Sequence, residues 1–149
     1  MNSNFNPLSA KELINRINKI PRVHLAQLPT VLEYAPNISK ELNINLYIKR
    51  DDCTALAFGG NKTRHLEFIM AKTLKGDYDC ILTGAASQSN FCRQAVAAAN
   101  KLNLDSYLVL MHGIKGKLMQ GNFLLYNILG ANVDVVEGED LEEIPKHLD

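Results

Sequence analysis

The sequence is short of cysteine, has no excess of charge and contains no long apolar run. Its three cysteines, Cys53, Cys80 and Cys92, are odd in number and lack CxxC spacing, which indicates reduced thiols and argues against a disulfide framework or a zinc site. Sixteen basic residues balance sixteen acidic residues, so neither nucleic acid nor an anionic membrane is an expected partner. A small molecule is the better expectation.

Targeting segments and common cofactor motifs are also missing. The stretch 1–8 has no charged and apolar leader pattern, and no run approaches the roughly 18 apolar residues of a membrane span, so we expect a cytoplasmic protein. The four histidines show no HxxxH spacing, and no metal site is predicted. The glycines between positions 113 and 121 do not form GxGxxG, which argues against NAD.

The first third of the chain has weaker patterns than the rest. Ser9 and Glu12 have capping-box spacing, which predicts a short amphipathic helix that ends before Pro21. The stretch through Pro29 and Pro36 predicts an irregular segment with a short helix. Residues 45–50 alternate in polarity and are a predicted strand.

The remaining chain alternates helices and strands. Helices are expected from residue 61 to Gly76, over 89–103, and over 117–129 before Gly130; strands are expected over 80–83, 107–111 and 133–136. This order predicts an α/β fold with an open, parallel, twisted sheet flanked by helices. Residues 139–144 would open a further helix, and we expect the end at Asp149 to be a truncation.

A first candidate site lies at Phe58-Gly-Gly-Asn-Lys62, a glycine pair followed by a lysine at a helix start. Glycine lets the backbone approach a ligand closely, and Asn61 is a favourable N-cap. At Lys62 the positive end of the helix dipole disfavours an ammonium, and a neutral amine is what Schiff-base chemistry requires. The alternative is a plain turn followed by a solvated lysine.

A second candidate site follows the strand at 80–83, in the run Thr83-Gly-Ala-Ala-Ser87-Gln-Ser89-Asn90. Backbone N–H groups at a helix start bind carboxylate or phosphate, and Ser87, Ser89 and Asn90 could add side-chain hydrogen bonds. The alternative is that one of them is only an N-cap. Residues 50–52, Arg-Asp-Asp, could form a carboxylate pair, although paired or solvated structural charges are favoured there.

These segments carry a family resemblance. Lys49-Arg-Asp-Asp52, Phe58-Gly-Gly-Asn-Lys-Thr-Arg64 and Leu66-Glu-Phe68 closely resemble the cofactor-lysine region of the D-cysteine desulfhydrase / 1-aminocyclopropane-1-carboxylate (ACC) deaminase family. The similarity continues through Gln88-Ser-Asn90, Arg93-Gln94 and Ala97-Ala-Ala99, in the same order and spacing. It runs from about Ile20 to Val136, with His65 where the family often has lysine.

The resemblance implies a pyridoxal 5'-phosphate (PLP) enzyme of fold type II. Lys62 is similar to the lysine that carries the cofactor and takes the substrate's α-proton, with Asn61 beside it. Asn90 resembles the residue that hydrogen-bonds the phenolic oxygen of PLP. Ser89 resembles a substrate-contacting serine and candidate nucleophile, and Ser87 and Gln88 would lie in the loop that holds the substrate carboxylate.

The resemblance also implies a reaction and a domain plan. A small amino acid would be the substrate, with D-cysteine giving pyruvate, ammonia and sulfide, or ACC giving a 2-oxo acid and ammonia. Residues 1–64 would belong to the larger cofactor domain and 65–149 to the small α/β domain. Relatives are about twice as long, so three hypotheses stay open: an enzyme fragment, a non-catalytic remnant, and a half-enzyme completed by another chain. A homodimer or another homo-oligomer is expected, because an uncovered apolar face promotes association.

Overall fold

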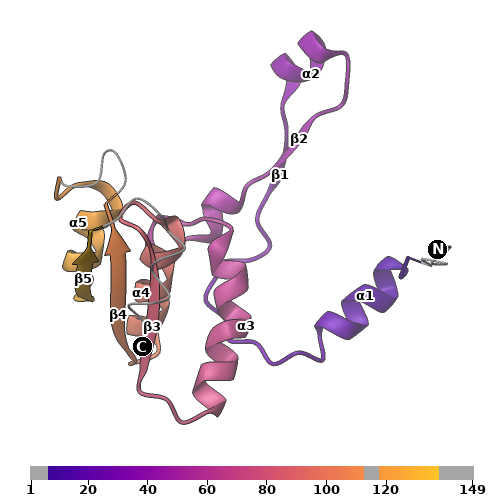
Figure 1. The fold of residues 1–149 in the computed structure, drawn as a ribbon. Coiled ribbons are helices and arrows are strands. Elements are labelled where there is room, and N and C mark those ends of the chain that lie inside the picture. Colours follow the sequence, from indigo (N-terminus) through magenta and orange to yellow (C-terminus); the bar gives the residue numbers. More distant parts are fainter. Residues whose placement is uncertain (1–6, 113–117, 138–149) are drawn as a thin grey trace, which may run out of the picture.

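The computed structural model describes residues 7–112 and 118–137 (Figure 1). This part of the chain consists of an extended N-terminal region followed by an α/β unit. The elements in chain order are α1 (Ala10–Ile17), β1 (Leu32–Tyr34), α2 (Pro36–Leu42), β2 (Tyr47–Lys49), two 3₁₀ turns (Asp51–Thr54 and Leu56–Phe58), α3 (Lys62–Lys75), β3 (Cys80–Ala86), α4 (Asn90–Lys101), β4 (Asp105–Met111), α5 (Gly121–Ile128) and β5 (Asn132–Val136).

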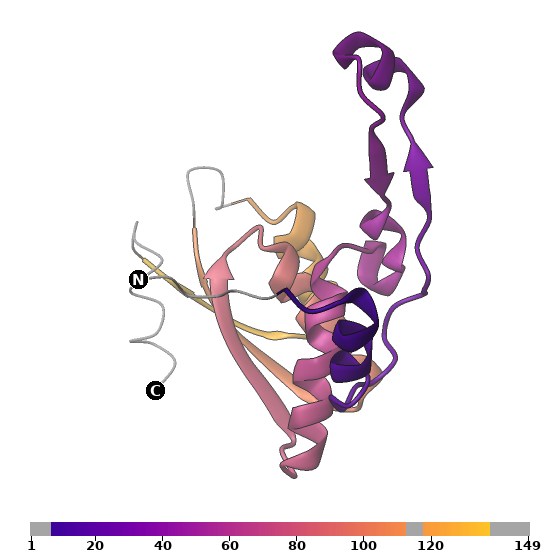
Figure 2. The same cartoon turned by 90° about the vertical axis from the view of Figure 1, so that its right-hand side faces the viewer.

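The α/β unit is built on a parallel sheet with strand order β3-β4-β5. In its register Cys80 lies opposite Asp105, and Tyr107 lies opposite Asn132. Each connection between neighbouring strands passes through a helix, α4 or α5, and Figure 2 shows both helices on the same side of the sheet. The predicted open parallel α/β architecture is therefore confirmed.

Helix α4 is the centre of the core. Leu66 and Met70 of α3 pack against its alanines, while Val96 on another side of α4 packs against Leu108 and Leu110 of β4. A helix covered on several sides must be apolar nearly all round, and small side chains let its neighbours approach closely. This explains the run of buried residues that follows Gln94 in α4, which comprises Ala95, Val96, Ala97, Ala98 and Ala99.

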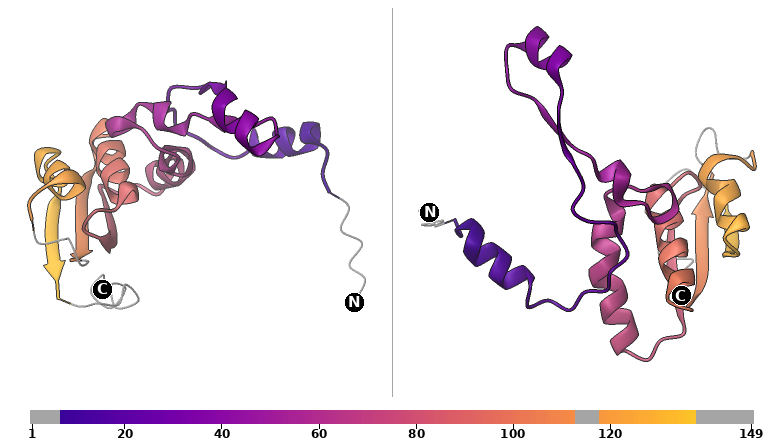
Figure 3. Two further views of the ribbon diagram at one scale, coloured as in Figure 1. Left: turned by 90° about the horizontal axis from the view of Figure 1, so that it is seen from above. Right: turned by 180° about the vertical axis from the view of Figure 1, so that it is seen from behind.

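The N-terminal region extends away from the sheet (Figure 1 and the right panel of Figure 3). The predicted capping box is confirmed, because Glu12 N donates to Ser9 Oγ (3.3 Å) and Ser9 N donates to Glu12 (3.0 Å). None of the residues of α1 is buried. Strand β1 pairs antiparallel with β2 and was not predicted, because it is three residues long and exposed throughout.

Glu67 joins the N-terminal segment to α3. Its carboxylate is buried; Oε1 accepts hydrogen bonds from the backbone N–H groups of Leu25 and Ala26, both at 3.0 Å. Its Oε2 lies 2.8 Å from Arg22 Nε, and the Arg22 side chain is about one-third exposed. The segment that precedes β1 is thereby held against the α/β unit.

Two boundaries differ from the sequence prediction by three residues or more. Strand β3 continues through Gly84 to Ala86, because it pairs with β4 over seven residues. Helix α5 begins at Gly121 and not near residue 117. Its start is fixed by Gln88, whose Oε1 accepts the backbone N–H of Asn122 at 2.9 Å, a partner that the local sequence cannot reveal. The helix expected over 139–144 lies outside the described residues.

Within the described ranges, none of the helices has both the length and the apolar character needed to cross a membrane.

Candidate active site at the start of helices α3 and α4

The glycine pair before Lys62 has a conformation that other residues rarely adopt. Gly59 and Gly60 have φ values of 72° and 131°. A Cβ at position 59 would overlap the backbone oxygen of Asp52, and one at position 60 would overlap the side-chain amide of Gln94. Both positions therefore require glycine. Lys62 follows as the first residue of α3 and is partly buried.

Buried polar side chains fix the loop that leads into α3. Thr54 is fully buried, and its Oγ1 lies 2.9 Å from both the N and the O of Gly60. Gln94 of α4 is also fully buried, and its Oε1 accepts hydrogen bonds from the N and the Oγ1 of Thr63, each at 2.7 Å. The residue directly after Lys62 is thus tied to α4.

The prediction that Asn61 caps α3 with its side chain is wrong. Asn61 holds the N-cap position, but its backbone is helical (φ −65°, ψ −20°) and its side chain makes no capping hydrogen bond. Gln94 supplies the acceptor for the helix start instead, by accepting the N–H of Thr63. A side chain from another helix has taken the place of the local cap.

The acidic residues of the 3₁₀ turn are paired with arginines. Arg64 donates to Asp51 through Nε (2.8 Å) and Nη2 (2.7 Å), and this pairing lowers the pKa of the Asp51 carboxyl. Arg50 donates to Asp52 through Nη2 (2.6 Å) and lowers the pKa of that carboxyl as well. The structural alternative is therefore confirmed for residues 50–52, since both carboxylates stay ionised and bound to guanidinium groups.

The second predicted segment lies at the carboxyl ends of the strands. Ser87 is buried, and its N donates to Met111 O at the end of β4 (2.8 Å). Ser89 is the N-cap of α4, because its Oγ accepts from Cys92 N at 3.3 Å. As an acceptor in that bond, the hydroxyl keeps its hydrogen for another partner. Ser89 therefore caps the helix and also offers a donor at the loop.

The buried side chain of Tyr126 binds the loop from the core side. Tyr126 is fully buried, and its hydroxyl donates to Ser89 O at 2.8 Å. Burial raises the pKa of Tyr126, so the phenol stays protonated as that bond requires. Burial also raises the pKa of the Cys92 thiol, which therefore stays protonated as well.

Asn122 organises the side chains of Gln88 and Asn90. The amide nitrogen Nδ2 of Asn122 donates to Gln88 O at 2.7 Å and to Asn90 Oδ1 at 3.0 Å. The side chain of Gln88 is occupied as well, since Oε1 accepts Asn122 N (2.9 Å) and Nε2 donates to Gln120 O (3.1 Å). The Gln88 side chain thus binds the start of α5, and Asn90 keeps its own amide nitrogen for a further acceptor.

Arg93 connects the two candidate segments. Its Nη2 donates to Gly59 O at 2.9 Å, and its Nη1 donates to Asn122 Oδ1 at 3.1 Å. The guanidinium therefore connects the lysine loop (residues 58–62) to Asn122, which in turn binds Gln88 and Asn90 of the Ser87–Asn90 loop. Sequence reasoning included Arg93 and Gln94 in the family motif without a role, and it gave no signal for Asn122.

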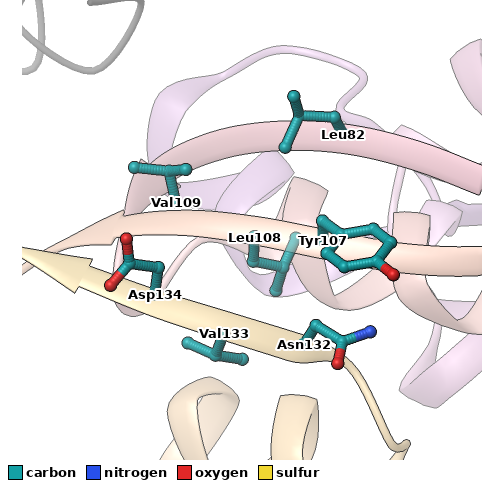
Figure 4. A pocket seen from close by; sticks show the side chains of 7 residues that line it. All are labelled: Leu82, Tyr107, Leu108, Val109, Asn132, Val133 and Asp134. Atoms are coloured by element: carbon teal, nitrogen blue, oxygen red, sulfur yellow. The ribbon is translucent and has the colours of Figure 1, made fainter. Parts of the chain in front are cut away.

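A separate depression of about 330 Å³ lies on the sheet itself. Figure 4 shows Leu82, Tyr107 and Asp134 among its lining residues, which come from the middle of β3 and β4 and from β5. Most of the lining is apolar, and it is set back from the carboxyl ends of the strands, where ligands of open α/β sheets bind. We therefore place the candidate active site at the loops described above.

Comparisons with known proteins show which family the chain belongs to. A D-cysteine desulfhydrase of Klebsiella pneumoniae is 37% identical over 91% of this chain and 44% of its own length. A Pyrococcus horikoshii protein provisionally named 1-aminocyclopropane-1-carboxylate deaminase is 42% identical over 87% of this chain and 39% of its own length. The crystal structure of an ACC deaminase homologue matches 94% of this chain and 42% of that protein, with a TM-score of 0.86 and 37% identity.

The chain thus spans about two-fifths of the length of these relatives. The model of the family "Pyridoxal-phosphate dependent enzyme" matches residues 23–147. This range includes every residue of the lysine loop, of the Ser87–Asn90 loop and of the Arg93–Asn122 connection between them. The chain belongs to the family of PLP-dependent enzymes, in the group that includes the D-cysteine desulfhydrases and the ACC deaminases.

Proposed function

We propose that this chain supplies the lysine half of a PLP-dependent lyase that acts on D-cysteine and releases pyruvate, ammonia and sulfide. The observation that carries the proposal is the connection of two loops through Arg93 and Asn122, one loop ending in Lys62 and the other carrying Ser89 and Asn90. Among the relatives, the desulfhydrases of Klebsiella and Salmonella at 37–39% identity support the choice of reaction.

The residues of these two loops fit PLP. An aldehyde needs a primary amine, which Lys62 offers at the first residue of α3, where it makes no ion pair with the described residues. A phenolic oxygen needs a donor, and the exposed Asn90 has an amide nitrogen whose partner carbonyl is already bound by Asn122. Lys62 would therefore hold the aldehyde carbon, beside Asn61, and Asn90 would hold the phenolic oxygen.

The chemistry follows from what these side chains can do. Bound PLP supplies an electron sink for negative charge that develops at the substrate Cα. The amine of Lys62 takes the α-proton as general base. The start of α4, with Ser87 and Gln88 shaping its loop, binds the substrate carboxylate through backbone N–H groups. The Ser89 hydroxyl, which keeps its hydrogen while it caps the helix, contacts the substrate.

The role of Lys62 can be tested by covalent trapping. The chain is incubated with PLP, reduced with borohydride, digested and analysed by peptide mass spectrometry, alongside Lys62→Ala and Lys72→Ala. Lys72 is a matched control because it is exposed on the same helix. We expect the pyridoxyl group on position 62 in the wild type and in Lys72→Ala, and none on this peptide in Lys62→Ala. Trapping spread evenly over surface lysines would contradict the assignment.

Ring opening of ACC is the second candidate reaction. It is favoured by the Pyrococcus relative at 42% identity and by the solved ACC deaminase homologue. In that reaction Ser89 is the proposed nucleophile. The product of the complete gene separates the two candidates: sulfide release from D-cysteine without 2-oxo acid formation from ACC supports the desulfhydrase, and the reverse result supports the deaminase.

The remaining proposals concern organisation. We propose that residues 1–64 belong to the larger cofactor domain and 65–149 to the small domain, and that the protein forms a homodimer or another homo-oligomer. A cytoplasmic location also stays a prediction. Two alternatives are a non-catalytic fragment and a half-enzyme completed by another chain. Activity of the 149-residue chain only after mixing with a second polypeptide would support the latter.

A further inference from the structure

We propose that Arg93 and Asn122 are positioning residues that orient the amide of Asn90, so that its N–H groups point outward into the site. This inference rests on the proposed function, in which Asn90 donates a hydrogen bond to the cofactor. It concerns a property of the protein alone, the direction of an amide group. It can therefore be tested with no cofactor present.

The direction of the amides is set by Arg93, because a guanidinium has donors and no acceptor. Arg93 Nη1 lies 3.1 Å from the side chain of Asn122, and the atom that faces it must be the carbonyl oxygen Oδ1. The amide nitrogen of Asn122 then points the other way, toward Gln88 O at 2.7 Å and Asn90 Oδ1 at 3.0 Å. In the series Arg93–Asn122–Asn90, the side-chain amide of each asparagine therefore accepts a hydrogen bond through its oxygen on one side and has its N–H groups on the other.

Asn122 has no alternative arrangement within this network. It is nine-tenths buried, and Gln88 O, which is an acceptor only, requires an N–H from it. Both of its Nδ2 hydrogens and its Oδ1 are used, so turning the amide by half a turn would break three hydrogen bonds. An unmade hydrogen bond at a buried site is costly, and the observed orientation is therefore strongly preferred.

Asn90 stands at the exposed end of the series. Its Oδ1 is held by Asn122, which leaves Nδ2 as the outward group. The same arginine also donates to Gly59 O at 2.9 Å, three residues before Lys62. A single guanidinium thus fixes the direction of the Asn90 amide and the position of the lysine loop relative to it.

Side-chain amide hydrogen exchange, followed by NMR on the free 149-residue chain, tests the orientation. We expect the side-chain amide hydrogens of Asn122 to exchange at least about tenfold more slowly than those of Asn90. Both Nδ2 hydrogens of Asn122 are hydrogen-bonded at a buried site, whereas Asn90 is exposed. Faster exchange at Asn122, or equal exchange at the two residues, would show that the amides are not oriented in this way and would overturn the proposal. This result needs no variant that has to fold.

A charge-for-amide substitution gives a second test. In Asn122→Asp the carboxylate offers acceptors only, so Asn90 must turn and donate its own N–H, and its exchange should slow by about tenfold. Asn127→Asp is the matched control, since Asn127 is exposed on the same helix α5 and should leave Asn90 unchanged. Unchanged exchange of Asn90 in a folded Asn122→Asp variant would overturn the proposal.

The cofactor readout separates this proposal from the proposed function. In the complete protein, a turned Asn90 presents its carbonyl oxygen to the site, and we expect Asn122→Asp to weaken PLP binding by about tenfold while trapping still occurs at Lys62. Unaltered PLP affinity together with slowed exchange at Asn90 would contradict the positioning role. Failure of trapping at Lys62 in the wild type would instead refute the proposed function.

Discussion

Replacing Glu67 by leucine should loosen the attachment of the N-terminal segment to α3. The carboxylate is buried and receives the backbone N–H groups of Leu25 and Ala26, each at 3.0 Å. Leucine has a similar size and no acceptor, so it removes these hydrogen bonds without leaving a large cavity. The effect should appear in the segment around residue 25, whose other attachments are the buried Leu25 side chain and the backbone hydrogen bond from Val23 N to Glu67 O (3.0 Å).

The magnitude follows from the environment of each partner. A hydrogen bond from the buried Leu25 N–H to a charged acceptor contributes roughly 1.5–3 kcal/mol, while the partly buried Ala26 N–H can turn to water and loses about 1 kcal/mol. The Arg22 pair adds little, since that side chain is about one-third exposed and can be hydrated. Leucine also removes the need to desolvate a carboxylate, which offsets part of this loss. The net loss should be about 2 kcal/mol.

Amide hydrogen exchange at Leu25 measures this loss directly. A decrease of about 2 kcal/mol corresponds to exchange roughly 30-fold faster than in the wild type. Glu67→Gln keeps an acceptor for both N–H groups and should cost about 1 kcal/mol, and Arg22→Ala should cost less than that. If the leucine variant exchanged at the wild-type rate at residue 25, the buried carboxylate would not be the attachment, and the reasoning would be refuted.

Three further predictions concern other parts of the chain. Arg64 lowers the pKa of Asp51, so this pair stabilises the folded state fully above the unfolded pKa of about 3.9. The stabilisation is lost as the pH falls through the lower pKa of the folded state. The free energy of unfolding of Asp51→Asn, measured with urea, should therefore depend less on pH in this acid range than that of the wild type. Gly59→Ala should lower the free energy of unfolding by at least about 2 kcal/mol in the same assay, because it combines a positive φ with overlap of a backbone oxygen. The chain should self-associate in light scattering, and Leu32→Gln should reduce this association whereas Leu118→Gln, a similarly exposed site outside the N-terminal region, should not.

The sequence predicted the α/β unit well because its signals are local. Helices α3 and α4 begin within one residue of their expected starts, and the three strands of the parallel sheet lie where apolar runs predicted them. Hydrophobic periodicity depends on residues that are close together in the chain, so it can be recognised without knowledge of tertiary contacts. The capping box at Ser9 and Glu12 was predictable for the same reason.

The errors share a physical cause, which is control of a local structure by a distant side chain. The side chain of Asn61 does not cap α3. The N–H of Thr63 is instead accepted by Gln94, which lies 31 residues further along the chain. Helix α5 begins late, because Gln88 binds the N–H of Asn122 from 34 residues away. Strand β1 is formed only by pairing with β2. None of these contacts leaves a periodic signal in the segment that it shapes.

The geometry of α4 also explains the spacing of the motif on which the resemblance rests. Residues three and four positions apart lie on the same side of a helix, so Asn90, Arg93 and Gln94 share one side of the first turns of α4. That side carries an outward amide at Asn90, an attachment for the lysine loop through Arg93, and an acceptor for the start of α3 through Gln94. A shift of one residue in any of the three would rotate it by about 100° away from its partner. The spacing Asn-x-x-Arg-Gln is therefore what one helix needs to support two halves of a site at once.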